Sequence, residues 1–183
     1  MSVRKISKEC PHHPEELEYL LALAGKASSI LEIGSRYGDC LAMMARRMPV
    51  PGRVVAVDLP GIQPWGYPDS EAFLRTNIAD LVSEGYDARM ILGDSTKPQV
   101  VEAVQLLAPF DLVFIDGDHR YQGVKQDWEN YGPMGRVVVF HDIVDSGGAK
   151  NAPEVWKLWQ QIKGNKSEFI GKDSLMGVGV VIR

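Results

Sequence analysis

Residues 29–38 read SILEIGSRYG, a short apolar run that ends in a turn containing two glycines. An apolar run bounded by a glycine predicts a buried β-strand over Ser29–Ile33. The residues that follow repeat at the three- and four-residue spacing of a helix: Leu41, Met44, Ala45 and Met48. Strand, turn and helix in this order are typical of a parallel α/β sheet.

The same alternation continues along the chain. Further strands are expected at Arg53–Asp58, Ala88–Leu92, Phe110–Ile115, Arg136–Phe140, Ser167–Ile170 and Met176–Ile182. Helical spacing marks the segments Pro14–Ala24, Leu74–Val82, Val100–Leu107, Tyr121–Tyr131 and Val155–Ile162. Helical crossovers make strands parallel, whereas the short turn between the last two strands makes that pair antiparallel. The expected class is α/β, a doubly wound, mostly parallel seven-stranded sheet with a C-terminal antiparallel hairpin.

Length, charge and hydropathy argue against several classes of protein, namely nucleic-acid-binding, membrane-spanning and secreted proteins. A chain of 183 residues predicts a single domain, 1–183, in which an N-terminal helical segment, 1–27, precedes the core, 28–183. The net charge of −4, without a dense basic block, argues against a nucleic-acid binder. No apolar run reaches the roughly 18 residues of a membrane span, and the N-terminus lacks a signal-peptide core. These features, with only Cys10 and Cys40 as thiols, predict a cytoplasmic protein without a membrane partner.

Titratable side chains stand at the carboxyl end of each of the first five strands. They are Glu32, Asp58, Asp94, then Asp116 with Asp118 and His119, and finally His141 with Asp142. In an open parallel sheet, ligands bind outside the carboxyl ends of the strands, near the point where the strand order reverses. Five such ends on one edge predict a binding site there.

The glycine turn indicates what kind of ligand binds. Gly34 allows close approach to the backbone and Gly38 opens the next helix, but the turn departs from the G-x-G-x-x-G dinucleotide pattern. Glu32 disfavours a pyrophosphate and favours a cationic or amino-bearing ligand. Asp58, twenty residues past Gly38, stands where a carboxylate receives two ribose hydroxyls.

These motifs resemble the class I S-adenosylmethionine-dependent methyltransferases. Residues 31–38 resemble the first motif of that family, Val57–Asp58 its second-strand acid, and Gly93–Ser95 its adenine-side motif. Residues 114–125 and 140–143 resemble a branch with a DGDH-Y-GV signature and an HD pair after the fifth strand. That branch includes small-molecule and sugar O-methyltransferases and cephalosporin hydroxylase-like proteins.

The resemblance implies a Rossmann-like methyltransferase fold and a set of ligands. S-adenosylmethionine is expected to be bound by Glu32, Gly34, Ser35, Tyr37, Gly38, Asp58, Leu59, Asp94, Ser95 and Asp116. In metal-dependent relatives, a divalent ion such as Mg or Mn lies between acids at the fourth and fifth strand ends. Those positions match Asp116 and Asp142, with His141 where some relatives have another acid.

The function implied is methyl transfer to an oxygen of a small-molecule acceptor. Asp118, His119 and His141 are the candidate catalytic bases, and a metal ion is the alternative means of activating the acceptor. Two other functions stay open: a methyltransferase-like protein that binds the cofactor without transfer, and a nicotinamide-dependent oxidoreductase, which the glycine pattern disfavours. The acceptor pocket is expected from loops 59–69 and 145–151 and the N-terminal helix, or from a second subunit of a homo-oligomer.

Structural roles compete with several of these assignments. Asp94 with Ser95, and Asp118 with His119, are residue types that also cap helices. His12 and His13, between two prolines, predict a solvated turn in which one of them caps the first helix. Trp65, between two glycines of the 59–69 loop, suggests a lid or a stacking side chain, and an anchor for that loop is the alternative.

Overall fold

The computed structural model describes residues 12–59, 69–145, 147 and 153–183, and it confirms the predicted order of strands and helices. The strands are β1 (Ser29–Ile33), β2 (Arg53–Asp58), β3 (Asp87–Leu92), β4 (Phe110–Ile115), β5 (Gly135–His141), β6 (Asn165–Phe169) and β7 (Val178–Ile182). The helices are α1 (Pro14–Ala24), α2 (Asp39–Ala45), α3 (Ser70–Ser83), α4 (Pro98–Gln105), α5 (Tyr121–Tyr131) and α6 (Val155–Gln161), with a 3-10 turn η1 (Gly132–Met134).

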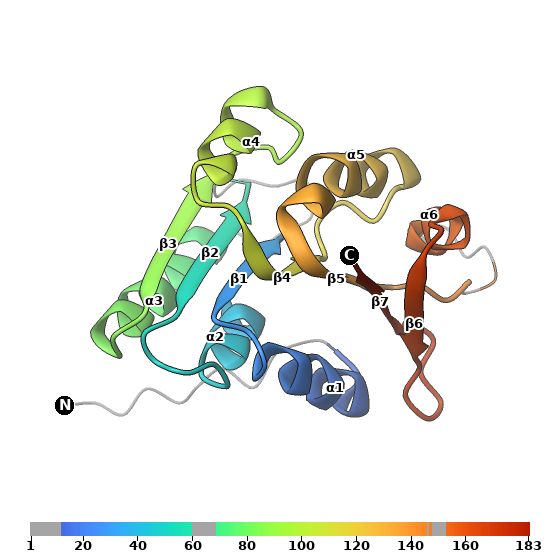
Figure 1. Cartoon of the computed structure of the whole chain (residues 1–183), viewed down its shortest axis with the longest axis horizontal. Coiled ribbons are helices and arrows are strands. Elements are labelled where there is room, and N and C mark those ends of the chain that lie inside the picture. Colours follow the sequence, from blue (N-terminus) through green and yellow to red (C-terminus); the bar gives the residue numbers. More distant parts are fainter. Residues whose placement is uncertain (1–11, 60–68, 146, 148–152) are drawn as a thin grey trace.

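The strands form one seven-stranded sheet in the order β3-β2-β1-β4-β5-β7-β6 (Figure 1). The strands from β1 to β5 pair in parallel, whereas β7 runs antiparallel to both β5 and β6. The predicted doubly wound sheet with an antiparallel C-terminal hairpin is therefore confirmed. The strand order reverses between β1 and β4, so the ligand crevice of such a sheet is expected at their carboxyl ends.

Helices cover both faces of the sheet because its buried strands are apolar on both sides. Alternate strand residues such as Ile30 and Val54 pack with α1, α2 and α3 in one core. Their neighbours, such as Leu31 and Val55, pack with α4, α5 and α6 in a second core on the other face. This explains why the predicted strands read as continuous apolar runs.

The observed bounds differ from the predicted ones mainly in the last three strands of the chain, β5, β6 and β7. β5 extends to His141, so this histidine is the last residue of a strand. β6 spans Asn165–Phe169 instead of 167–170, and β7 begins at Val178. Much of β6 is exposed, so its sequence lacks the buried apolar run that locates the central strands.

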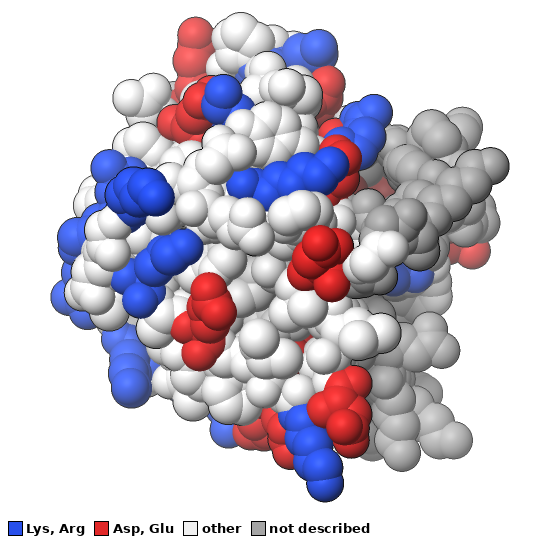
Figure 2. All heavy atoms as spheres, turned by 90° about the vertical axis from the view of Figure 1, so that its right-hand side faces the viewer, with Lys and Arg blue, Asp and Glu red and all other residues white. Residues whose placement is uncertain are grey.

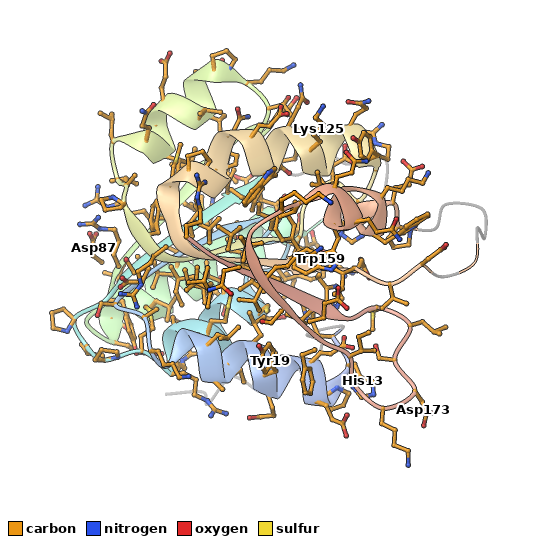
Figure 3. The ribbon with its side chains drawn as sticks, turned by 45° about the vertical axis from the view of Figure 1, so that its right-hand side comes forward. His13, Tyr19, Asp87, Lys125, Trp159 and Asp173 are labelled. Carbon is orange, nitrogen blue, oxygen red and sulfur yellow. The ribbon has the colours of Figure 1, made fainter. Side chains whose placement is uncertain are left out.

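Helix α1 packs against the β6–β7 hairpin, far from it in sequence. The ring of Tyr19 stacks on that of Phe169 with centroids 4.7 Å apart. In Figure 3, Tyr19 and His13 lie on the side of α1 that meets this hairpin, whose turn carries Asp173. The start of α1 is thereby held next to the end of β5, which positions the N-terminal residues for the site.

The described surface carries mixed charge. On the face seen in Figure 2, acidic side chains interrupt the basic ones, consistent with the net charge of −4. Across residues 12–59, 69–145 and 153–183, no helix combines the length and the hydropathy that a bilayer crossing requires.

Candidate functional site

The glycine turn after β1 lies against the end of β4. Gly34 has a φ of 90°, and its N–H donates to the carbonyl of Val57 in β2 at 2.9 Å. A Cβ at this position would overlap the carbonyl oxygen of Asp116 and lie 2.5 Å from Gly117 Cα. Only glycine fits there, because the obstacles are backbone atoms of the neighbouring strand end. Gly38, with a φ of 79°, is the N-cap residue of α2, as predicted.

Asp58, the last residue of β2, connects this turn to the neighbouring strand. Its Oδ2 accepts a hydrogen bond from the backbone N–H of Arg36. Burial raises the pKa of Asp58, while the hydrogen bonds from the N–H groups of Arg36 and Leu59 oppose the shift. The carboxylate is thus held at the carboxyl end of the parallel strands by the glycine turn itself.

The other residues predicted at this turn lie in different surroundings. Glu32 is buried inside β1 at a position whose register partners, Ala56 and Phe114, belong to the core covered by α1–α3. Ser35 is buried, and Leu59 is exposed. The ring of Tyr37 packs edge-on against Phe73 of α3, with centroids 5.6 Å apart.

Asp94 and Ser95, the polar residues predicted after β3, make hydrogen bonds in the loop before α4. Asp94 Oδ1 accepts from the N–H and the hydroxyl of Thr96, which lowers the pKa of Asp94. Ser95 donates its hydroxyl to Asp127 Oδ1 at 2.6 Å. The N-cap residue of α4 is Lys97, which has no side-chain cap, so these contacts are not the helix capping that the sequence offered as the alternative for Asp94 and Ser95. Contact with adenine stays a prediction.

A cluster of histidines and carboxylates occupies the ends of β4 and β5. We call it the histidine–carboxylate cluster; it consists of His12, Asp116, His119, His141 and Asp142. Asp116 Oδ2 lies 3.2 Å from His12 Nε2, while its Oδ1 lies 3.4 Å from His119 Nε2 and 3.6 Å from His141 Nδ1. Asp142 Oδ2 lies 2.9 Å from His119 Nδ1. The structure therefore brings together all three predicted metal ligands and two of the three predicted bases.

The charges in this cluster shift one another's protonation. Burial alone would raise the pKa of Asp116, but hydrogen bonds from His119, His12 and His141 hold it well below its ordinary value. Burial likewise opposes charge on His119 and His141, yet the two carboxylates raise the pKa of His119 to about 11 and of His141 to about 9. The histidine contacts also lower the pKa of Asp142 to about 2, against the effect of burial. Perturbed carboxylates and imidazoles in one crevice are typical of a functional site.

The third predicted base, Asp118, is held in the turn that begins α5. Its Oδ1 accepts from the N–H of Arg120, and both carboxylate oxygens accept from the Arg120 guanidinium at 2.6 to 3.1 Å. These bonds hold the loop before α5, whose N-cap residue is Arg120 and has no side-chain cap, so they differ from the helix capping that competed with the catalytic role. A catalytic role for Asp118 remains a prediction.

His12 is the site residue that the sequence interpretation missed. The prediction of a solvated turn is wrong for His12, which is only 8% exposed, whereas His13 caps α1 by accepting from the N–H of Glu15. Tertiary packing determines the position of His12, because its carboxylate partner lies 104 residues away.

Glu16 is a second missed residue. It stands in the first turn of α1, where an acidic side chain suits the positive helix start, but its side chain is fully buried. Its Oε1 accepts from the N–H groups of Gly171 and Gly177, and its Oε2 lies 3.7 Å from His141 Nε2. Its position four residues before buried Leu20 is the signal that could have placed Glu16 on the inner face of α1.

Some predictions fall outside the described residues. Trp65 and most of the 59–69 loop, Cys10, and most of the 145–151 loop are among them. The lid, stacking and anchor roles of Trp65 therefore stay predictions.

Comparisons with known proteins point to one family. A family model described as a methyltransferase domain matches residues 31–143. The ribosomal RNA large subunit methyltransferase E of Myxococcus xanthus is 27% identical over 112 residues, which are 61% of this chain and 45% of that protein. The chain thus spans less than half the length of this relative.

Solved structures extend the likeness over nearly the whole chain. The O-methyltransferase TomG from Streptomyces achromogenes, in complex with SAM, gives a TM-score of 0.70 at 18% identity, over 96% of this chain and 82% of that chain. An O-methyltransferase from Bacillus cereus, in complex with SAH, gives a TM-score of 0.65 at 21% identity, over 94% of this chain and 82% of that chain. At such identities, the likeness concerns the fold.

Proposed function

The chain belongs to the methyltransferase-domain family, and from this premise we propose that it transfers a methyl group from S-adenosylmethionine to an oxygen of a small molecule. One observation carries the proposal: the glycine turn after β1 touches the backbone at Asp116. A cofactor on the turn and an acceptor beside the histidine–carboxylate cluster would therefore be neighbours at one edge of the sheet.

The chain's own residues suit the cofactor's chemistry. Asp58 would accept hydrogen bonds from both ribose hydroxyls, as the acid at the end of the second strand does in related sheets. Gly34 would let the cofactor approach the backbone, since glycine itself carries no side chain.

Methyl transfer is an in-line displacement. The acceptor oxygen forms a bond to the methyl carbon, the bond from that carbon to the sulfonium sulfur breaks, and the acceptor's proton passes to a base. Holding the two reactants in line supplies up to about 7–11 kcal/mol of the barrier reduction. His119, which follows β4, is more exposed than His141 at the end of β5 and is the better placed to meet an acceptor. It would accept the proton only in its neutral form, which Asp116 and Asp142 disfavour by raising its pKa.

The donor set of the cluster fits a divalent metal ion. Asp116, His141 and Asp142 offer two carboxylates and an imidazole, with His141 Nδ1 3.6 Å from an oxygen of each acid. These are accepted ligands for several divalent ions, among them the expected Mg or Mn. When bound, such an ion supplies a Lewis acid that lowers the pKa of the acceptor hydroxyl.

The proposal is tested directly by product formation. The purified chain, incubated with S-adenosylmethionine and a panel of hydroxylated small molecules, is expected to release S-adenosylhomocysteine and a methylated product, detected by mass spectrometry. Tight binding of the cofactor with no turnover on any acceptor would instead favour a methyltransferase-like binding protein.

Removing metal is expected to abolish turnover. Excess chelator should eliminate product formation, and adding back a divalent ion should restore it, because the ion orients and acidifies the acceptor. Calorimetry of S-adenosylmethionine binding in the same chelator provides the control, since that affinity should hardly change. Full turnover in chelator would mean that the cluster acts through hydrogen bonds alone.

Replacing Asp58 by alanine is expected to weaken cofactor binding about 10- to 100-fold. The change removes charge-assisted hydrogen bonds worth about 1.5–3 kcal/mol. Calorimetric titration with S-adenosylmethionine measures the effect. The matched control is Asp87→Ala, which removes an exposed carboxylate at the start of β3, the opposite end of the sheet from Asp58. Unchanged affinity in a folded Asp58→Ala protein would contradict the assignment.

The acceptor is proposed to be a small molecule rather than a nucleic acid, on the evidence of the mixed surface charge. A surface groove of about 360 Å³ lies between the start of α5 and α6, and its lining is aromatic and amide-rich. The residues that line it are Tyr121, Trp156, Lys157, Gln160 and Gln161. A second subunit of a homo-oligomer is a further source of pocket residues.

A further inference from the structure

We propose that His12 and Glu16, from the start of the chain, complete a nitrogen-rich transition-metal site at the histidine–carboxylate cluster. His12 Nε2, Asp116 and His141 Nδ1 bind the ion, and Glu16 positions His141 from behind. The catalytic role of this ion rests on the proposed function. His12 is a ligand beyond the three predicted from the sequence, and the ion is a transition metal of the nitrogen-binding kind instead of the expected Mg or Mn.

His12 and His141 converge on one carboxylate. The two rings lie edge to face with centroids 4.3 Å apart, and both residues are buried. A single ion would give both ring nitrogens and Asp116 a common partner. Buried charges in proteins are paired or coordinate metals.

The distances suit coordination. One ligand atom from each of His12, Asp116 and His141 lies within 4.8 Å of the others, and the His12 Nε2 to Asp116 Oδ2 distance is 3.2 Å. Bonds of about 2.0–2.2 Å from an ion to nitrogen and oxygen place ligand atoms about 3–4 Å apart. Small side-chain movements therefore bring the three donors onto one ion.

Glu16 determines which nitrogen of His141 is available. Among the described residues, Glu16 Oε2 and His141 Nε2 are buried atoms without a hydrogen-bond partner, and they face each other at 3.7 Å. A proton on Nε2 is stabilised by this carboxylate, which leaves the Nδ1 lone pair directed at Asp116. Metal-binding histidines commonly donate their second N–H to a carboxylate in this way. Two backbone N–H groups fix the other Glu16 oxygen, so the carboxylate is held in place.

The donor set decides the class of metal. Two imidazoles and a carboxylate suit Zn²⁺, Fe²⁺, Co²⁺ or Ni²⁺, whereas Mg²⁺ prefers carboxylates, carbonyls and water. A second group, Asp116, His119 and Asp142, has two carboxylates and one imidazole. His119 is 40% exposed and its Nδ1 contacts Asp142 at 2.9 Å, so we assign it to the acceptor side of the site.

Metal binding without turnover tests the assignment. The full chain is stripped with chelator, dialysed, and titrated with Zn²⁺ or Mg²⁺ in competition with a fluorescent chelator. We expect one Zn²⁺ per chain and at least tenfold weaker binding in His12→Ala and Glu16→Gln, since loss of a ligand or its orienting partner costs about 10- to 100-fold. The matched control, His13→Ala, should bind as the unmodified chain does. His12→Gln, which keeps a polar side chain, replaces His12→Ala if that variant fails to fold.

The visible spectrum of bound Co²⁺ distinguishes a residue that binds or orients the metal site from one with a structural role only. With Co²⁺ bound, His12→Gln and Glu16→Gln are expected to change the visible absorption of the ion, whereas His13→Ala should leave it unchanged. Zn²⁺ binding and a Co²⁺ spectrum that are both indifferent to His12, or a preference for Mg²⁺, would overturn the inference. S-adenosylmethionine affinity measured on the same samples reports on the proposed function separately, because Asp58 and the glycine turn hold no part of this ion.

Discussion

Replacing Gly34 by alanine is expected to destabilise the fold by about 2–5 kcal/mol. A side chain at a positive φ costs about 1–2 kcal/mol, and an added methyl group that finds no room costs about 1–3 kcal/mol more. The atoms that it would meet are Asp116 O and Gly117 Cα, backbone atoms that cannot rotate away. Urea unfolding at neutral pH measures the free-energy difference.

Gly164 provides the matched control. It also has a positive φ, 114°, but nothing lies within 4 Å of its Cβ position. Gly164→Ala should therefore show only the backbone contribution, about 1–2 kcal/mol. Equal losses in the two variants would mean that the close approach of β1 to β4 is easily relaxed.

Replacing Asp127 by asparagine is expected to stabilise the chain by about 2–3 kcal/mol at pH 8. Burial raises the pKa of Asp127 to about 6, with Asp118 and Asp94 adding to the shift against the hydrogen bond from Ser95. The folded chain therefore binds this proton more tightly than the unfolded chain, whose carboxyl has a pKa of about 3.9. The unmodified chain therefore loses folding free energy as the pH rises from about 4 to 6. Each unit of difference between the folded and unfolded pKa values of Asp127 corresponds to about 1.4 kcal/mol.

Urea unfolding at several pH values checks this expectation. The amide of the Asp127→Asn variant keeps an oxygen to accept from Ser95 but cannot ionise, so the stability gain over the unmodified chain should grow between pH 5 and pH 8. Asp80→Asn on α3 is the control for the exchange of a carboxylate for an amide at an exposed position. A gain for Asp127→Asn that is constant across this range would contradict the raised pKa.

The sequence predicted the central strands to the residue and the site only in part. β1, β2 and β4 have the predicted bounds because each is largely buried on both faces and its residues are mostly apolar. β6 has no such pattern and was misplaced. Asp116, His119, His141 and Asp142 were located because strand ends of a parallel sheet converge.

His12 and Glu16 could not be placed in the same way. His12 precedes the first regular element, and its neighbours in the cluster come from strand ends more than a hundred residues later. The contacts of Glu16 lie 155 and 161 residues away, in and after the turn that follows β6. The spacing of apolar residues predicts the helix on which Glu16 lies. Only the packing of α1 against the β6–β7 hairpin determines which groups form hydrogen bonds with its carboxylate.

The strand order determines which edge of the sheet stays unpaired while the chain is being synthesised. Each strand from β2 to β5 pairs with one that has already been made, but β6 pairs only with β7, which comes after it. The edge of β5 therefore stays open while residues 142–182 are synthesised, about 2 to 8 s at about 5–20 residues per second. An open apolar edge is where chains aggregate. The rate of translation of this segment therefore sets how long the β5 edge of each new molecule stays unpaired.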